Sequence, residues 1–146
     1  MAGSLVDAFE TEILELIFEN ADLVGIGDNL LGAVTPGSFY IALFTADPTD
    51  TGSIANEATY TGYARKAIVR AGAQWTTATG ATENTAAITF DACTGGSNTI
   101  THFAICKAGT RDVTDLIMHG DLDAQLIVSD GITPEFAAGA LDISIG

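Results

Sequence analysis

Short apolar runs separated by strong turn signals fill the chain after Ser38, and this feature most limits the folds open to it. Several runs alternate apolar with polar side chains, as Ile88, Phe90 and Ala92 do. A period of two predicts strands that bury one face. We therefore predict a mainly β fold, a β-sandwich or jelly roll of about eight short strands with an N-terminal amphipathic helix. The predicted strands are 39–46, 63–71, 84–92, 99–107, 113–119, 125–128, 132–137 and 140–145.

The N-terminal segment has a helical period instead. From Leu5 to Ala21 apolar residues recur at helical spacing, and Ser4 with Asp7 fits a capping box at its start. The apolar arc is wider than the stripe of about 100° that a surface helix buries. We expect one stripe to pack on the chain itself and an adjoining one, Leu14 and Phe18, to contact a second copy. The predicted helical interface residues are Phe9, Ile13, Leu14, Ile17 and Phe18.

The length of 146 residues suits a single domain. We predict that residues 1–38 form the helix and a connecting loop, and that residues 39–146 form the β-sandwich.

The charge is strongly unbalanced, with 19 acidic and 5 basic residues and a formal net charge of −14. Such a chain is repelled by phosphate backbones and anionic lipid, so we predict no nucleic-acid or membrane partner. The first positive charges, Arg65 and Lys66, belong to the predicted interface. They could meet the acidic surface of another copy or pair within the chain. The start of the sequence lacks the basic region of a signal peptide, which predicts function without secretion.

The residues give no catalytic pattern. His102 and His119 lie in strand-like runs without metal-ligand spacing, and no G-x-S-x-G elbow is present. We predict no enzyme, no catalytic residues and no cofactor. Calcium is the open alternative, because three acidic pairs could supply oxygen ligands, although none has calcium-loop spacing. The pairs are Asp47/Asp50, Asp121/Asp123 and Asp112/Asp115, and we expect Asp47 to close a turn at Pro48.

The two cysteines are predicted to be buried free thiols. The segment 86–106 resembles a hairpin that turns at residues 95–98, which would place Cys93 near Ile100 and Cys106 near Ala87. Because a disulfide needs Cα atoms within about 7 Å, no bridge is expected, as suits a reducing compartment.

Five segments in order resemble a family of small tailed-phage virion proteins often described as tail-fibre-like. They are FYIALFTADPTDTGS, GYARKAIV, NTAAITF, THFAI and FAAGALDISIG, and a helix resembling EILELIFEN precedes them in that family. The resemblance runs from about Glu12 to Ile145. It implies a non-enzymatic structural protein of the virion, assembled in the host cytoplasm.

Three functions are compatible with this resemblance. The first is a capsid decoration (cement) protein that associates with itself, as a trimer for preference, on the major capsid protein. The alternative is a tail-fibre or tail-adaptor subunit that binds another tail protein. A more remote alternative is a carbohydrate-active enzyme that uses an Asp/Glu pair.

Overall fold

The computed structural model describes residues 5–23 and 37–145. These residues form antiparallel sheets and one N-terminal helix, so the predicted mainly β, sandwich-like fold class is confirmed. None of the helices in this described part is long and apolar enough to cross a membrane. The elements are α1 (Asp7–Leu14), η1 (Glu15–Glu19), β1 (Ser38–Phe44), β2 (Lys66–Val69), β3 (Trp75–Ala78), β4 (Ala81–Asn84), β5 (Ile88–Thr89), β6 (Ser97–Cys106), η2 (Val113–Asp115), β7 (Leu116–Ser129), β8 (Glu135–Phe136) and β9 (Asp142–Ser144).

Two compact units share the chain. Of the described residues, the first unit, which we call the helix unit, combines residues 5–23 and 37 with residues 69–88 and 136–145. The second, the sheet unit, combines residues 38–68 and 89–135. This division does not follow the predicted border at residue 38, because the chain enters and leaves each unit more than once. That all 146 residues form one domain stays a prediction.

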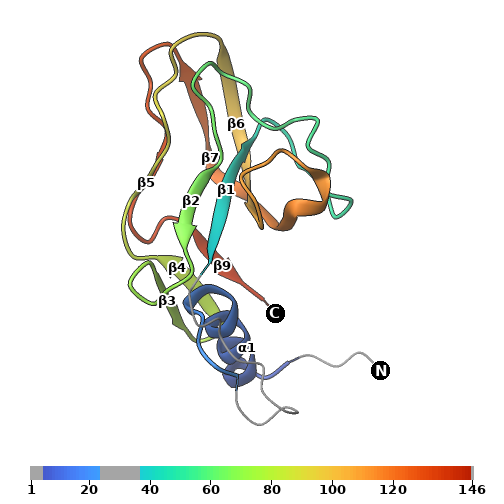
Figure 1. Ribbon diagram of the computed structural model, residues 1–146, viewed down its shortest axis with the longest axis vertical. Helices are drawn as coiled ribbons and strands as arrows, with labels where there is room; N and C mark the ends of the chain where they lie inside the picture. Colours follow the sequence, from blue (N-terminus) through green and yellow to red (C-terminus); the bar gives the residue numbers. More distant parts are fainter. Residues whose placement is uncertain (1–4, 24–36, 146) are drawn as a thin grey trace. The chain divides into compact units, whose positions relative to one another are not determined.

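The sheet unit is built on strands in the order β2-β1-β6-β7 (Figure 1). Strand β1 pairs antiparallel with β6, with Tyr40 opposite Cys106 and Phe44 opposite His102. Residues 41–44 are all buried, so both faces of β1 are covered, as its continuous apolar sequence requires. A core cluster forms here from Ala42, Phe44, Ala104 and Cys106, with Tyr40 and Leu116 packed against it.

Strand β7 is the longest strand in the described residues and ends the order of this sheet. Two separate strands, 113–119 and 125–128, were expected here. A shift in register between Ile100 and His102 allows one continuous strand to follow β6 instead. The exposed Asp121 and Asp123 lie in the middle of β7, and charges at an edge strand oppose pairing with other chains.

The helix unit packs α1 and η1 with the sheet β3-β4-β9 (Figure 1). The Phe18 ring meets Trp75 edge to face, with the ring centroids 4.7 Å apart. Residues 15–19 make one turn of π-helix, and Asn20 ends it in the left-handed conformation. The Arg70 guanidinium donates to the carbonyl oxygens of Leu16 and Ile17, which places a cation at the negative end of the helix.

The predicted helix of residues 5–21 is therefore present, but its predicted capping box is not confirmed. Ser4 lies outside the described residues. The residue at the N-cap position is Val6, and no side chain caps the helix there.

The hairpin β3–β4 was not predicted. Thr79 and Gly80 connect the strands with φ of 53° and 76°, and Ala78 pairs with Ala81 across this two-residue turn. Two successive positive φ angles are the conformation of a type I′ turn, in which Asn-Gly is the common pair. The sequence signal for this turn is weak, because the first turn position is occupied by Thr79 and not by asparagine.

The predicted hairpin over residues 86–106 is wrong. Strand β5 pairs with β8, and beyond it the Cys93 N–H donates to the Ile132 carbonyl at 2.8 Å. Strand β6 pairs with β1 and β7, so Cys106 lies opposite Tyr40 and Leu116, and not near Ala87. The partners of both segments are distant in sequence, which turn signals do not reveal. Both cysteines are nevertheless free and buried, as predicted.

Candidate functional site

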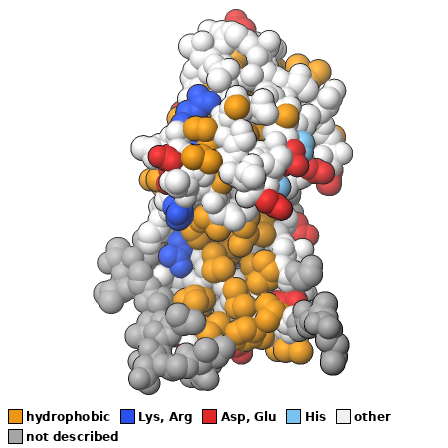
Figure 2. All heavy atoms as spheres, turned by 90° about the vertical axis from the view of Figure 1, so that its right-hand side faces the viewer, with side chains coloured by type: hydrophobic (Ala, Val, Ile, Leu, Met, Phe, Trp, Pro, Cys, Tyr) orange, Lys and Arg blue, Asp and Glu red, His pale blue; other side chains and the backbone are white. Residues whose placement is uncertain are grey.

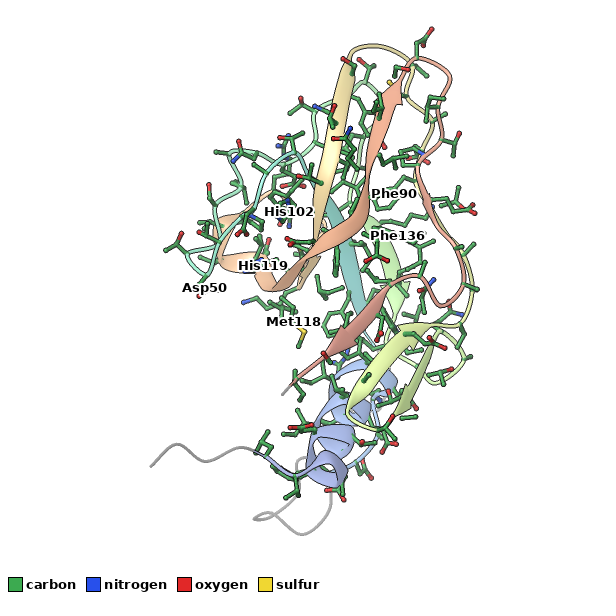
Figure 3. All side chains as sticks on the ribbon, turned by 180° about the vertical axis from the view of Figure 1, so that it is seen from behind. Asp50, Phe90, His102, Met118, His119 and Phe136 are labelled. Atoms are coloured by element: carbon green, nitrogen blue, oxygen red, sulfur yellow. The ribbon has the colours of Figure 1, made fainter. Side chains whose placement is uncertain are left out.

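The loop after β1 is tied to β7 by a histidine. His119 Nδ1 lies 3.2 Å from Asp47 Oδ1, and its Nε2 lies 3.4 Å from Asp50 Oδ1. Figure 3 shows His119 and Asp50 side by side, and in Figure 2 histidine atoms lie beside acidic side chains. Asp47 also accepts a 2.8 Å bond from the Thr49 N–H, so it closes the turn at Pro48 as predicted.

Members of the other two predicted acidic pairs also have partners within the chain. Asp121 lies 2.8 Å from His102 Nε2, while Asp112 accepts the backbone N–H and hydroxyl of Thr114. Those hydrogen bonds from Thr114 lower the pKa of Asp112. Within residues 5–23 and 37–145, no group of three or more His, Cys, Asp or Glu side chains is arranged to hold a metal ion.

A buried ion pair is the most concentrated polar feature of the sheet unit. Glu57 and Arg65 have fully buried side chains. Arg65 Nε donates to Glu57 Oε1 at 2.9 Å, and Nη2 donates to Oε2 at 3.0 Å, which gives a bidentate pair. Arg65 Nη1 donates to the Ala108 carbonyl at 3.1 Å and lies 3.8 Å from Asp115. The Arg65 donors are therefore directed at partners within the chain.

Two further side chains complete the contacts of Glu57. The Tyr63 hydroxyl donates to Glu57 Oε1 at 3.0 Å and accepts the Leu43 N–H at 3.1 Å. Arg111 approaches from the other side, with Nε 3.4 Å from Glu57 Oε2 and Nη2 3.3 Å from the Glu57 carbonyl oxygen. Burial of the Arg65 guanidinium acts to lower its pKa, but the hydrogen bond with Glu57, together with the charges of Cys106, Glu57 and Tyr63, outweighs burial and raises the pKa.

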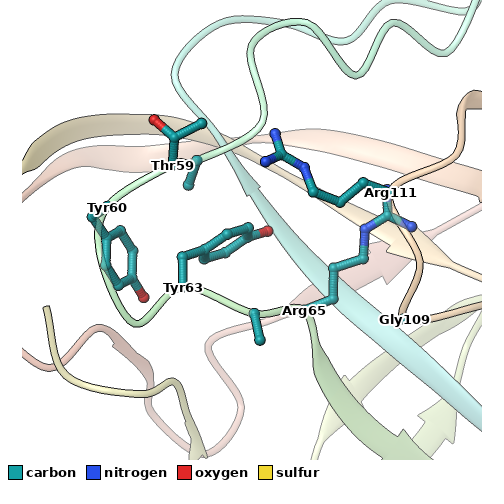
Figure 4. A pocket seen from close by; sticks show the side chains of 8 residues that line it. Thr59, Tyr60, Tyr63, Arg65, Gly109 and Arg111 are labelled. Carbon is teal, nitrogen blue, oxygen red and sulfur yellow. The ribbon is translucent and has the colours of Figure 1, made fainter.

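A pocket of about 290 Å³ opens beside this network (Figure 4). Its polar lining comes from Thr59, Arg65 and Arg111, and its aromatic lining from Tyr60 and Tyr63. The two tyrosine rings meet edge to face, with centroids 5.4 Å apart. Of the two arginines, Arg65 is buried and Arg111 keeps 44% of its side chain exposed. Arg111 is thus the charged group that the pocket presents to solvent.

Burial protects three protons of the sheet unit at high pH. It raises the pKa of Cys106 to about 11 and that of Tyr60 to about 12, and it raises the pKa of Tyr63 further, with the nearby Glu57 charge adding to the effect. The unfolded chain releases these protons at the ordinary values of 9.0 for cysteine and 10.0 for tyrosine. The free energy of unfolding should therefore fall as pH rises above about 9.

Tyr63→Phe should make this alkaline decline shallower. Above pH 10 each protected group contributes a slope of about 1.4 kcal/mol per pH unit, because the unfolded state has lost a proton that the folded state keeps. At neutral pH the variant is less stable, since the Leu43 N–H loses its acceptor, so the slope is the informative quantity. Urea unfolding between pH 9.5 and 11 measures it. Equal slopes in both proteins would contradict the assignment to Tyr63.

Two of the predicted interface residues are core residues instead. Leu14 and Phe18 are 0% exposed within the chain itself, and Phe18 packs against Trp75. We therefore correct the expectation that this stripe contacts a second copy. Arg65 is also buried and paired with Glu57. Of the two alternatives for this arginine, the structure therefore shows pairing within the chain.

The remaining interface residues stay a prediction. Phe9, Ile13, Ile17 and Lys66 are half-buried. The exposed side chains of Leu5 and Val6 precede the helix and extend its apolar surface.

The residues of the pocket were not predicted from the sequence, apart from Arg65. Glu57, Tyr60 and Tyr63 lie in the loop between β1 and β2, and Arg111 follows β6 by a further loop. The available signal was a carboxylate eight positions before the first arginine, in a chain with 5 basic residues. That spacing has no helical or strand period, so it does not indicate contact.

Comparison with known families matches a model described as "Podophage GP4 fiber I protein gp80" to residues 5–144. Comparison with curated proteins gives no match. The family match covers nearly the whole chain and confirms the predicted resemblance to tail-fibre-like phage proteins. The chain therefore belongs to the podophage GP4 fiber I protein gp80 family and is a structural protein of a tailed bacteriophage.

Proposed function

We propose that this protein is a non-enzymatic subunit of a phage tail fibre. The observation that carries the proposal is the match of a fibre-protein family model to residues 5–144. That match supports the tail-fibre reading better than capsid decoration, the first of the three functions compatible with the sequence. A fibre is a component of the virion, and a structural role suits a small chain that is mainly β.

The chemistry of the pocket supports a role without catalysis. A general base needs a free carboxylate, and Glu57 is already held by Arg65 and Tyr63. A general acid needs a proton that leaves near neutral pH, whereas the pKa of Tyr60 is raised by burial to about 12. The groups that line this pocket are therefore suited to a structural role and not to acid–base catalysis.

The proposed partners are further copies of the chain and another tail protein. We propose a symmetric homo-oligomer, because symmetric oligomers are the common way to bury an apolar helix surface, and we keep the trimer as the expected state. The proposed contact is the half-buried stripe of Phe9, Ile13 and Ile17, together with Leu5 and Val6, which are 47% and 68% exposed. With a net charge of −14, the chain should favour apolar contacts between copies over electrostatic ones.

Quantitative mass spectrometry of purified virions tests the proposal. A tail-fibre subunit should be present far below the major capsid protein in copy number. The number of copies should also be a multiple of the oligomer that cross-linking identifies. Copy numbers comparable to those of the major capsid protein would instead support decoration and overturn the fibre proposal.

A further inference from the structure

We propose that the pocket of Figure 4 binds a small carboxylate-bearing ligand through the Arg111 guanidinium. The inference rests on the chemistry of the pocket and does not depend on the fibre role.

Arg111 has more N–H hydrogen-bond donors than its contacts with Glu57 use. A guanidinium carries five N–H groups, one on Nε and two on each terminal nitrogen. Arg111 donates one Nη2 hydrogen to the Glu57 carbonyl oxygen, and its Nε lies 3.4 Å from Glu57 Oε2. In the described part of the chain, Nη1 has no protein partner, so both of its hydrogens and the second hydrogen of Nη2 are left for a ligand. The Nη1/Nη2 edge matches the two oxygens of one carboxylate.

The guanidinium is also held in place before any ligand arrives. Its contacts with Glu57 join it to a carboxylate that is fully buried and fixed by the bidentate bond to Arg65. A ligand therefore does not bear the whole entropic cost of ordering a long side chain. Arg65 itself cannot serve as the ligand group, because its side chain is buried and its donors are directed at Glu57, Ala108 and Asp115.

The charge distribution favours a single anionic group. Four of the 5 basic residues, Arg65, Lys66, Lys107 and Arg111, lie in the sheet unit of a chain whose net charge is −14. One exposed guanidinium can offset one carboxylate here. A polyanion such as a nucleic acid would be repelled by the surrounding acidic surface.

The walls of the pocket limit the size of the ligand. A volume of about 290 Å³ is at the lower end of the usual range of roughly 300–1,000 Å³ for small-molecule sites. The half-buried Tyr63 ring offers an apolar wall, and the exposed Thr59 side chain also lines the pocket. A sugar acid or an acidic amino-acid side chain has this size and this chemistry, and the experiment separates the two sources.

Titration followed by amide NMR tests the proposal with the intact protein. The probes are glucuronate, neutral glucose as its matched control, and the N-acetyl amide of glutamate. We expect saturable shifts at the amides of Thr59, Tyr63 and Gly109 with one or both acids, and none with glucose. Saturation by glucuronate alone would identify a sugar acid, and saturation by the glutamate derivative alone an acidic side chain.

Variants assign the binding to Arg111. Arg111→Gln should weaken it about tenfold or more, since a charge-assisted bidentate contact is lost. Lys107→Gln removes an exposed cation of the same unit that does not line the pocket, and it should leave the affinity unchanged. Thr59→Trp fills the pocket while keeping Arg111 in the sequence, and it should also abolish binding. The near-UV circular dichroism of each variant confirms its fold.

Three results would overturn the proposal. The first is the absence of saturation with either acid. The second is equal affinity in the wild type and in a folded Arg111→Gln variant. The third is an equal loss in Arg111→Gln and Lys107→Gln, which would mean that the acid responds to overall charge and not to the pocket.

Discussion

The double variant Leu14→Ser/Phe18→Ser should lose the packed structure of the helix unit. Both side chains are 0% exposed, and Phe18 packs against Trp75 at 4.7 Å between ring centroids. Truncating a buried leucine or phenylalanine costs about 2–5 kcal/mol, and each new hydroxyl must also be buried or hydrated. Together the two changes should remove at least about 5 kcal/mol, which is as much as the whole stability of many domains.

The aromatic residues allow each unit to be followed separately. The single tryptophan, Trp75, lies in the helix unit, and all 3 tyrosines lie in the sheet unit. The emission of Trp75 should therefore move to that of a solvated indole in the double variant without denaturant. A urea titration of the wild type gives the reference transition.

The matched control is Phe9→Ser/Ile17→Ser, which changes half-buried residues of the same helix. This protein should keep the wild-type emission of Trp75. If the stripe contacts another copy, its oligomer should dissociate in sedimentation velocity. The opposite pattern, with Leu14→Ser/Phe18→Ser folded but dissociated, would restore the intersubunit role first expected for Leu14 and Phe18.

Glu57→Gln should strongly destabilise the sheet unit. The substitution keeps the shape of the side chain but removes the charge that compensates the buried Arg65. Breaking one partner of a buried ion pair costs about 3–5 kcal/mol, because the remaining charge stays uncompensated in the interior. Near-UV circular dichroism of the tyrosines under urea measures the loss, since Tyr63 is bonded to Glu57 directly.

A second variant separates charge from packing. Glu57→Gln/Arg65→Met removes both charges and should recover most of the lost stability, because an apolar replacement of a buried pair is often neutral or favourable. A loss below about 1 kcal/mol in Glu57→Gln alone would show that water reaches the pair, as at exposed salt bridges. It would also mean that Glu57 does not hold the Arg111 guanidinium rigidly, as the proposed ligand site requires.

The sequence predicted those elements whose signal is local. The helix of residues 5–21 shows its period over several turns, and α1 with η1 occupies residues 7–19. The apolar run at residues 39–46 likewise predicted β1, and 99–107 predicted most of β6. Each of these segments carries enough apolar residues to reveal its own geometry without knowledge of its partners.

The sequence failed where the partner of a segment is distant. Predicted strand 84–92 contains only the last residue of β4, then a turn and β5, and from Ile88 onward its pairing partners lie near residues 132–136. Leu14 and Phe18 formed a stripe that we expected to contact a second copy, but both are buried within the chain and Phe18 packs on Trp75. Periodicity shows that such a face is buried, but not by what.

The residues of the pocket could not be predicted from local sequence patterns, for the same reason. Glu57 and Arg111 are 54 positions apart and both lie in loops, where no period indicates contact. Asp47 was easier to interpret, because an aspartate before a proline closes a turn with residues that follow directly.

Immunogold electron microscopy of intact virions tests the central claim most directly. Antibodies against this chain, applied to the phage particles that carry it, should place gold at the tail. A matched antibody against the major capsid protein should label the head of the same particles. Gold distributed over the head by the antibody against this chain would contradict the fibre assignment and favour capsid decoration.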